Sequence, residues 1–128
     1  MTQDRGIWPG LAYDDPLAAR EWLRQIGFED GILVPGPDEG QVDHSEMHWP
    51  EGGRVRVHSP LPGPDLASPT GAGNSYVVTA DPDAVHERAR AMGATFVRDL
   101  EETDYGSRGF SVRDPEGNAW SFGTYAGS

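Results

Sequence analysis

The segments DPLAAREWLRQIG (residues 15–27) and DPDAVHERARAMG (residues 81–93) decide the fold of this chain. Laid over each other at a shift of 66 positions (81 − 15 = 66), they share the pattern D-P-x-A-x-x-E-x-x-R-x-x-G without a gap. In each copy the aspartate suits a helix N-cap, the proline suits the first helical position, and the glycine suits the helix end. An internal repeat of this kind indicates a duplicated structural unit.

Each copy predicts the same series of elements. The helices are expected at about residues 16–26 and 82–92, and an apolar extended run precedes each one, at residues 11–13 and 76–78. Three strand candidates separated by turn-forming residues follow each helix, at residues 31–34, 42–49 and 54–59, and at residues 95–99, 109–113 and 119–125. The sequence therefore predicts an α+β domain made of two βαβββ modules.

The whole chain is expected to be one domain. Its 128 residues suffice for a single apolar core but not for two independent ones. Module one covers about residues 6–59 and module two about residues 74–126. Residues 60–73, PLPGPDLASPTGAG, are rich in Pro and Gly and lack periodicity, so they are expected to be a linker between the modules.

Composition excludes several classes of function. The formal net charge is -11, all ten basic residues are Arg, and Cys is absent. Disulfides, thiolate metal sites and lysine Schiff bases are thereby excluded. Nucleic acid and anionic membranes are unfavourable partners, whereas the acidic surface either attracts a cationic small molecule or only keeps the protein in solution. No apolar run is long enough for a membrane span and no signal peptide is recognisable, so we expect a cytoplasmic location.

A family resemblance emerges from both modules. The stretch DYGSRGFSVRDPEGNAWSFGTY (residues 104–125) resembles the second-module ending of the glyoxalase, bleomycin-resistance and extradiol-dioxygenase superfamily, also called the vicinal oxygen chelate fold. LAYDDPLAAREWLRQIGF (residues 11–28) resembles the first-module opening. The resemblance implies an incomplete barrel with the helices outside and a cup inside for metal, substrate or drug. It also implies a homodimer.

The metal ligands of the superfamily's enzymes are replaced here. In those enzymes the ligands come from the first and last strands of a module, and the matching positions of this chain hold Trp8, Ser75 and Ser121. Indole and neutral hydroxyl groups are poor ligands for a divalent ion. The resemblance therefore implies no metal, no other cofactor and no catalytic residue, and it favours a binding protein over an enzyme.

Polar residues alternate on two neighbouring strands of module one. His44, Glu46 and His48 point to one face of their strand because side chains alternate along an extended chain. If Met47 shares the apolar face with the valines of the next strand, this set lies beside Arg54, Arg56 and His58. Such a face lines the cup, or it is a solvated or dimer-facing surface of ion pairs. A displaced metal site that uses two of His44, Glu46 and His48 with a third ligand from elsewhere is a further alternative.

Aromatic residues at strand ends are suited to a flat or cationic ligand. His86, on the second helix, is expected to be exposed. The candidate ligand-binding residues are Trp8, His44, Glu46, His48, Trp49, Arg56, Ser75, Tyr105, Arg108, Trp120 and Ser121.

We therefore expect a metal-independent protein that binds a small organic molecule, cationic or aromatic, with antibiotic sequestration as one form of this function. The alternative is a metal-dependent lyase, isomerase or dioxygenase with a non-standard site, or a metal-free acid/base catalyst that uses His44 and Glu46. A third alternative is a protein that acts through its interactions with other proteins and has an empty cup. The identity of the ligand stays open. So does the question of whether the cup is built within one chain or across a dimer.

Overall fold

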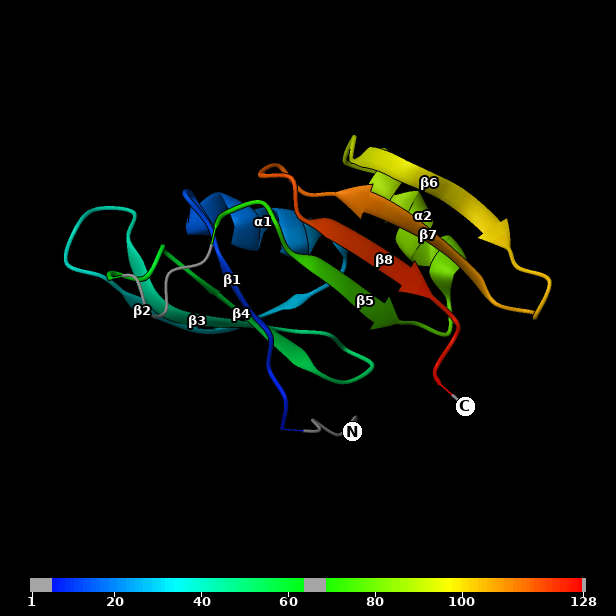
Figure 1. The fold of residues 1–128 in the computed structure, drawn as a ribbon, viewed down its shortest axis with the longest axis horizontal. Coiled ribbons are helices and arrows are strands. Elements are labelled where there is room, and N and C mark those ends of the chain that lie inside the picture. The colour runs from blue at the N-terminus through cyan, green and yellow to red at the C-terminus, as the bar shows by residue number, and fades with distance from the viewer. Residues whose placement is uncertain (1–5, 64–68, 128) are drawn as a thin grey trace.

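A computed structural model describes residues 6–63 and 69–127, and it contains the predicted element order twice (Figure 1). Module one has four strands and a helix, β1 (Gly10–Ala12), α1 (Pro16–Ile26), β2 (Glu29–Pro35), β3 (Val42–His48) and β4 (Arg54–His58). Module two repeats them as β5 (Asn74–Val78), α2 (Pro82–Ala91), β6 (Thr95–Glu102), β7 (Arg108–Arg113) and β8 (Ala119–Gly123). The prediction of an α+β fold with two βαβββ modules is confirmed.

The helix boundaries follow the repeated motif. The side chain of Asp15 accepts a hydrogen bond from the Ala18 N–H at 3.1 Å, and Asp81 does the same for Ala84 at 3.1 Å. Gly27 adopts a φ of +133° directly after α1, a conformation that disfavours any residue with a Cβ. Both helices therefore begin where the Asp-Pro pairs predict.

Each module forms a four-stranded mixed sheet. Sheet A has the order β1-β4-β3-β2 and sheet B the order β5-β8-β7-β6. The pairs β1–β4 and β5–β8 are parallel, and the other pairs are antiparallel. Across the described parts of the chain no strand of one sheet pairs with a strand of the other. The barrel is therefore left incomplete within one chain.

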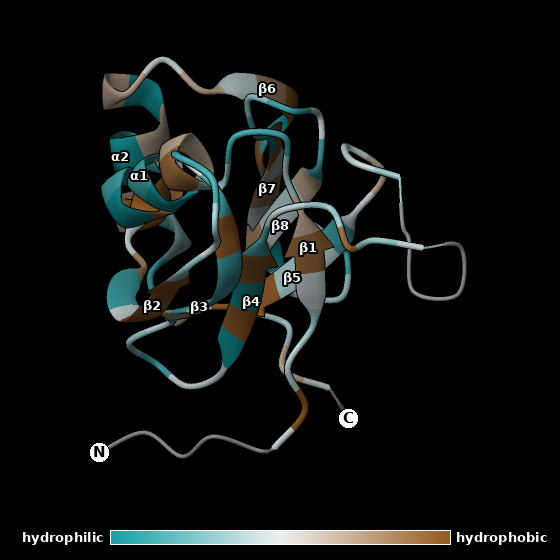
Figure 2. Ribbon diagram, turned by 90° about the vertical axis from the view of Figure 1, so that its left-hand side faces the viewer, coloured by the Kyte–Doolittle hydropathy of each residue, from teal (hydrophilic) through white to brown (hydrophobic). Residues whose placement is uncertain are grey.

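Both modules contribute to a single hydrophobic core on the helix side of the sheets. Figure 2 shows α1 and α2 on the same side of the two sheets. Aromatic rings join the modules across this core: Phe28 lies 5.6 Å from Trp120, Trp49 lies 5.6 Å from Phe122, and Trp22 lies 6.5 Å from Trp120 (centroid distances). Because the helix-side faces share one core, the opposite face of each sheet points away from that core and is not covered by a helix.

Two turns fasten each module to the other in a reciprocal way. The Glu116 carboxylate, in the β7–β8 turn, accepts hydrogen bonds from the N–H groups of Asp14 and Asp15, both at 2.8 Å. The Glu51 carboxylate, in the β3–β4 turn, accepts one from the Ala80 N–H at 2.8 Å. Each glutamate thus holds the strand-to-helix junction of the other module.

A buried carboxylate strengthens one of these junctions. Asp114 accepts hydrogen bonds from the Tyr13 hydroxyl at 2.5 Å, the Trp120 Nε1–H at 3.1 Å and the Asn118 side-chain amide at 3.0 Å. Burial, together with the charge of Asp114, raises the pKa of the Tyr13 hydroxyl well above its usual range. Tyr13 therefore remains a neutral donor that ties β1 to module two.

Part of the predicted linker, residues 64–68, lies outside the described residues. Neither of the two helices in the described ranges is long and apolar enough to cross a membrane.

Candidate functional site

The uncovered face of sheet A carries the predicted polar residues. Met47 pairs with Val55, Glu46 with Arg56 and His48 with Arg54, so the predicted pairing of like faces is confirmed. Because successive side chains of a strand point to opposite faces of the sheet, Met47 and Val55 face the core, and the polar side chains of β3 and β4 lie together on the opposite face. This face is called the open face of sheet A below.

Glu46 is the centre of this polar group. Its Oε2 lies 2.6 Å from Nε2 of His44, and its Oε1 accepts a hydrogen bond from Arg54 Nη1 at 2.7 Å. The hydrogen bonds from His44 and Arg54 hold the pKa of the Glu46 carboxyl below its usual range. The guanidinium of Arg54 also lies over the Trp8 ring, 4.4 Å from its centroid. Glu46 is therefore an ionised carboxylate with both oxygens engaged.

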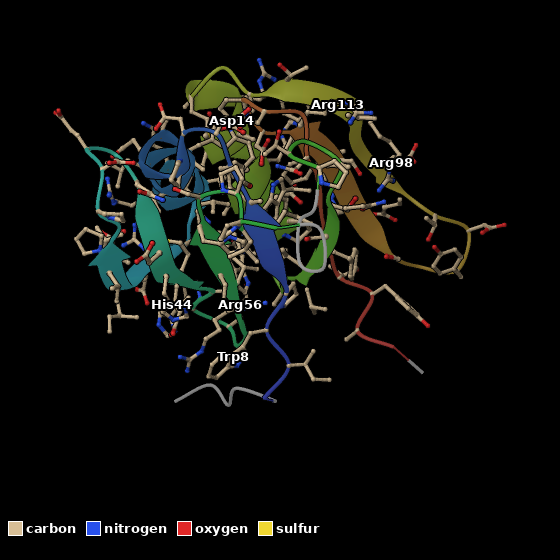
Figure 3. The ribbon with its side chains drawn as sticks, turned by 60° about the vertical axis from the view of Figure 1, so that its left-hand side comes forward. Trp8, Asp14, His44, Arg56, Arg98 and Arg113 are labelled. Atoms are coloured by element: carbon tan, nitrogen blue, oxygen red, sulfur yellow. The ribbon has the colours of Figure 1, made fainter. Side chains whose placement is uncertain are left out.

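Arg56 and His48 complete the open face. The Arg56 Nε–H donates to the Trp8 carbonyl at 3.4 Å, and its guanidinium lies over Gly10, where an added Cβ would be 2.5 Å from Nη2. His48 is half-buried, with its ring against Gly31. Trp8, His44 and Arg56 lie in the same part of the molecule (Figure 3). The structure thus brings together five of the predicted site residues on one face.

A cavity of about 700 Å³ lies at the seam between the two sheets. Its floor consists of core aromatic rings, Phe28, Trp49 and Trp120. One wall is β5, and the other includes the β3–β4 turn and the first residues of β4. This cavity, called the seam cleft below, has a volume typical of sites for small organic ligands.

Three further predicted residues, Trp49, Ser75 and Trp120, line the seam cleft. Trp49 is 6% exposed and Trp120 is fully buried, so a small part of the Trp49 ring is accessible at the base of the cleft and the Trp120 ring lies beneath that surface. Their indole N–H groups are already engaged, with Val78 O at 3.1 Å and with Asp114 Oδ2 at 3.1 Å. The floor therefore offers an apolar surface without an open donor from these indoles.

The remaining predicted residues lie on module two. Tyr105 is 72% exposed and contributes to a smaller cavity of about 430 Å³ with Tyr76, Arg98 and Tyr125. Its ring lies 6.3 Å from that of Tyr125. Tyrosine rings beside a guanidinium suit a planar ligand.

Ser121 and Arg108 are held in other contacts. The Ser121 hydroxyl lies 2.7 Å from that of Ser111, on the open face of sheet B. Arg108 donates to both carboxylate oxygens of Asp83, at 2.8 and 3.2 Å, which ties β7 to α2. Arg108 lies outside the linings of both the seam cleft and the smaller cavity beside Tyr105.

Some site residues were not selected from the sequence, namely Phe28, Arg54, Tyr76 and Arg98. The sequence predicted Phe28 as a core residue, and it is buried. Only the packing of the two modules shows that Phe28 also lies at the base of a cleft. Tyr76 pairs with Ser121 across parallel strands, so the strand register could have identified it. Strand alternation predicted Arg54 beside His44, Glu46 and His48, although Arg54 was not selected as a ligand-binding residue. Arg98 gave no local signal beyond its charge.

The expectation that His86 is exposed is wrong. Its ring packs against Phe96 and Phe110 at centroid distances of 5.1 and 5.3 Å, and its Nε2 lies 2.7 Å from Asp99 Oδ1. The hydrogen bond from the Leu100 N–H and that from His86 lower the pKa of the Asp99 carboxyl. A helix position that faces the neighbouring sheet thus buries most of this imidazole.

A divalent metal, which the resemblance associates with this fold, does not fit the residues present. The parallel pairing of first and last strands sets Gly10 opposite Arg56 in module one and Tyr76 opposite Ser121 in module two. None of these four is a good metal ligand, and Arg56 brings a positive charge. Within residues 6–63 and 69–127 no three His, Asp or Glu side chains are grouped so that they could hold an ion.

Comparison with known proteins shows relatives along nearly the whole chain. The chain is 32% identical over 131 residues to an uncharacterized protein of Mycobacterium bovis, an alignment that covers 96% of this chain and 85% of that protein. It superimposes on the crystal structure of TioX from Micromonospora sp. ML1 with a TM-score of 0.72 and 30% identity, covering 96% of this chain and 97% of TioX. A lactoylglutathione lyase from Agrobacterium tumefaciens shares the fold, with a TM-score of 0.67, 19% identity and coverage of 96% and 91%.

The family model described as "Glyoxalase/Bleomycin resistance protein/Dioxygenase superfamily" matches residues 9–122. This range contains both modules, the open face of sheet A and the aromatic floor of the seam cleft. With the two βαβββ modules and the relatives above, the match shows that the chain belongs to the glyoxalase/bleomycin resistance protein/dioxygenase superfamily.

Proposed function

We propose that this chain is a binding protein that holds a small aromatic organic molecule in the seam cleft without the help of a metal. The observation that carries the proposal is the cleft itself, about 700 Å³ with a floor of three buried aromatic rings. A cavity of this size and lining favours a flat, largely apolar ligand.

The charges around the cleft set the polar requirements of the ligand. Glu51 and Arg54 both line it, so a ring system that carries either a cationic or an anionic group has a nearby partner. The net charge of -11 raises the local concentration of cationic molecules near the protein. A cationic or aromatic ligand is therefore the class to test first, and within it antibiotics, because the family description includes bleomycin resistance.

We propose that binding is independent of a metal because of the residues on β4 and β8, the strands that pair with the first strand of each module. A divalent ion bound by the protein needs carboxylate or imidazole ligands, whereas β4 and β8, the strands that pair with β1 and β5, carry Arg56 and Ser121 opposite Gly10 and Tyr76. Elemental analysis of protein purified without chelator tests this point. Stoichiometric Zn, Ni, Mn or Fe that disappears in the His44→Ala variant would contradict it.

We also propose that two copies assemble as a homodimer. The open faces of both sheets lie opposite the common core, so a second copy packed against either face would close a cup over it. Light scattering after size exclusion measures the mass directly. A mass of about 14 kDa at all micromolar concentrations would contradict the dimer.

Ligand binding is tested by titration with planar aromatic antibiotics. The Val78→Tyr variant adds bulk to the wall of the cleft, and Val97→Tyr is the matched control, because Val97 is exposed on β6 and outside the cleft lining. We expect quenching of tryptophan fluorescence and heat of binding in the wild type and in Val97→Tyr, with both lost in Val78→Tyr. Equal binding by both variants would place the ligand elsewhere.

A second candidate function is acid/base catalysis by the His44–Glu46 pair. The observation that favours it is the 2.6 Å contact between His44 Nε2 and Glu46 Oε2, because a carboxylate can orient an imidazole for proton transfer. Turnover of lactoylglutathione by metal-free protein, lost in His44→Ala, would support this candidate. Turnover that requires an added metal ion would instead favour a lyase with a non-standard metal site.

A further inference from the structure

Arg56 lies on the open face of sheet A, and among the described residues no carboxylate binds it. Other arginines of residues 6–63 and 69–127 do bind carboxylates, namely Arg20, Arg24, Arg54, Arg98 and Arg108. Glu46 lies opposite Arg56 in the strand register, but His44 and Arg54 occupy its two oxygens. Within the described ranges the Arg56 side chain makes one hydrogen bond, from Nε to the Trp8 carbonyl at 3.4 Å. Its Nη groups can therefore accept an anion from outside the chain.

Gly10 provides the space in which this guanidinium lies. Gly10 is opposite Arg56 in the parallel pair of β1 with β4. A Cβ added to Gly10 would be 2.5 Å from Nη2 of Arg56 and 2.9 Å from its Cζ. The guanidinium therefore crosses from β4 onto β1 and covers the backbone of Gly10, a position that a larger residue would not allow.

A cation thus lies where the family resemblance associates a metal. The resemblance places metal ligands on the first and last strands of a module, and in module one these strands meet at Gly10 and Arg56. A divalent ion attracts anionic oxygens by its charge. A guanidinium does the same with a fork of N–H donors that matches both oxygens of a carboxylate. The corresponding pair of module two, Tyr76 and Ser121, carries no charge, so this feature belongs to sheet A.

Apolar surface lies next to the guanidinium. Trp8, whose carbonyl accepts the Arg56 hydrogen bond, is 40% exposed, and the adjacent Ile7 is 83% exposed. Figure 3 shows Trp8 and Arg56 in the same part of the molecule. An exposed ion pair contributes little by itself, because water competes for both charges. Burial of an aromatic ring against the indole adds to it, so an acid that carries a ring fits this place better than a bare anion.

The net charge of -11 does not prevent such binding. Repulsion between exposed charges is screened beyond about 8 Å at physiological ionic strength. The contacts with the nearest groups therefore decide the affinity, and the carboxylate nearest to Arg56 in the register, that of Glu46, is paired with Arg54.

We propose that Arg56 binds the carboxylate of a small aromatic acid on the open face of sheet A, with the ring of the acid against Trp8. The site selects an anion where the resemblance associates a divalent cation. Arg56 lies outside the lining of the seam cleft, so this inference goes beyond the proposed function and can fail independently of it.

The test compares benzoate with benzamide, a neutral molecule with the same ring and nearly the same shape. Spectra of the 15N-labelled full-length protein follow the Nε–H signals of the arginine side chains. Benzoate should shift the signal of Arg56, and benzamide should bind about tenfold more weakly, because it lacks the charge-assisted pair of hydrogen bonds. Arg56→Gln should abolish benzoate binding. Arg113→Gln is the matched control, because Arg113 also donates to a backbone carbonyl, that of Gly117.

Gly10→Ala tests the position of the guanidinium without removing it. The new methyl group displaces the end of the Arg56 side chain, so benzoate should bind about tenfold more weakly while the variant stays folded in thermal unfolding. Benzoate and benzamide binding equally, absence of an Arg56 shift at millimolar benzoate, or benzoate binding that survives Arg56→Gln would each overturn the proposal.

Two further measurements separate this site from the other proposals. Val78→Tyr should leave benzoate binding unchanged, and a loss in that variant would place benzoate in the seam cleft and overturn the assignment to Arg56. If Arg56→Gln converts a dimer to a monomer in light scattering while benzoate shifts no Arg56 signal, Arg56 binds a carboxylate of a second copy, and the small-molecule site is rejected.

Discussion

The hydrogen bond between Tyr13 and Asp114 should be a main stabiliser of the contact between the modules, and Tyr13→Phe tests it. Both side chains are buried, and the hydroxyl donates at 2.5 Å to a carboxylate oxygen. A hydrogen bond to a charged group contributes about 1.5–3 kcal/mol. Because Trp120 and Asn118 continue to donate to Asp114 in the variant, the carboxylate is not orphaned, and we expect a loss of about 2 kcal/mol in the free energy of unfolding.

The expected change in melting temperature follows from chain length. An unfolding entropy of about 2.1 cal/mol/K per residue gives about 0.27 kcal/mol/K for 128 residues. A loss of about 2 kcal/mol then lowers Tm by about 7 °C. Calorimetry and urea unfolding at pH 7 measure both quantities. Tyr76→Phe is the matched control, because Tyr76 is 49% exposed and donates to a neutral carbonyl, that of Tyr125.

The same hydrogen bond predicts a dependence on alkaline pH. The pKa of Tyr13 is raised in the folded protein, so its contribution is fully present below the unfolded value of about 10 and is lost as pH rises above it. The difference in stability between wild type and Tyr13→Phe should therefore shrink from about pH 9 to about pH 11. The reasoning is refuted if Tyr13→Phe is no more destabilising than Tyr76→Phe, or if the difference stays constant over this pH range.

Three other perturbations have definite expected outcomes. Glu46→Gln should lower the free energy of unfolding by about 1 kcal/mol at pH 7 in urea titrations. Because the pKa of Glu46 is lowered in the folded state, its contribution is present above the unfolded value of about 4.3 and lost below it, so the variant should match the wild type at about pH 2. Gly31→Ala should lower the free energy of unfolding by about 2 kcal/mol, because the new methyl group would lie 2.6 Å from the backbone oxygen of Glu46. Gly10→Ala should lower it by less than about 0.5 kcal/mol, because the new methyl group meets the flexible end of the Arg56 side chain. Equal losses of the two variants in thermal unfolding would disprove this contrast. Expression of the wild type in a sensitive bacterial host should raise the inhibitory concentration of a bound antibiotic, and an equal rise with Val78→Tyr would separate resistance from the seam cleft.

Local patterns in the sequence determined the architecture of the modules. The repeated Asp-Pro and Gly positions predicted both helices, because capping and proline geometry act within a few residues. Alternation along residues 42–49 and 54–59 predicted which side chains share the polar face, because the two-residue period of a strand is a local property. The family resemblance also came from the sequence, through motifs at the ends of both modules.

Only the tertiary structure decided how the modules meet, and the seam cleft depends on that meeting. Trp49 and Trp120 are buried at its floor because rings from the two modules pack against each other, a contact between residues far apart in the chain. The position of Arg56 opposite Gly10 follows from the parallel pairing of β1 with β4, which no local pattern encodes. The burial of His86 likewise depends on the packing of α2 against sheet B. Periodicity reports which face of an element is apolar, but the partner of that face is chosen by the packing of the whole chain.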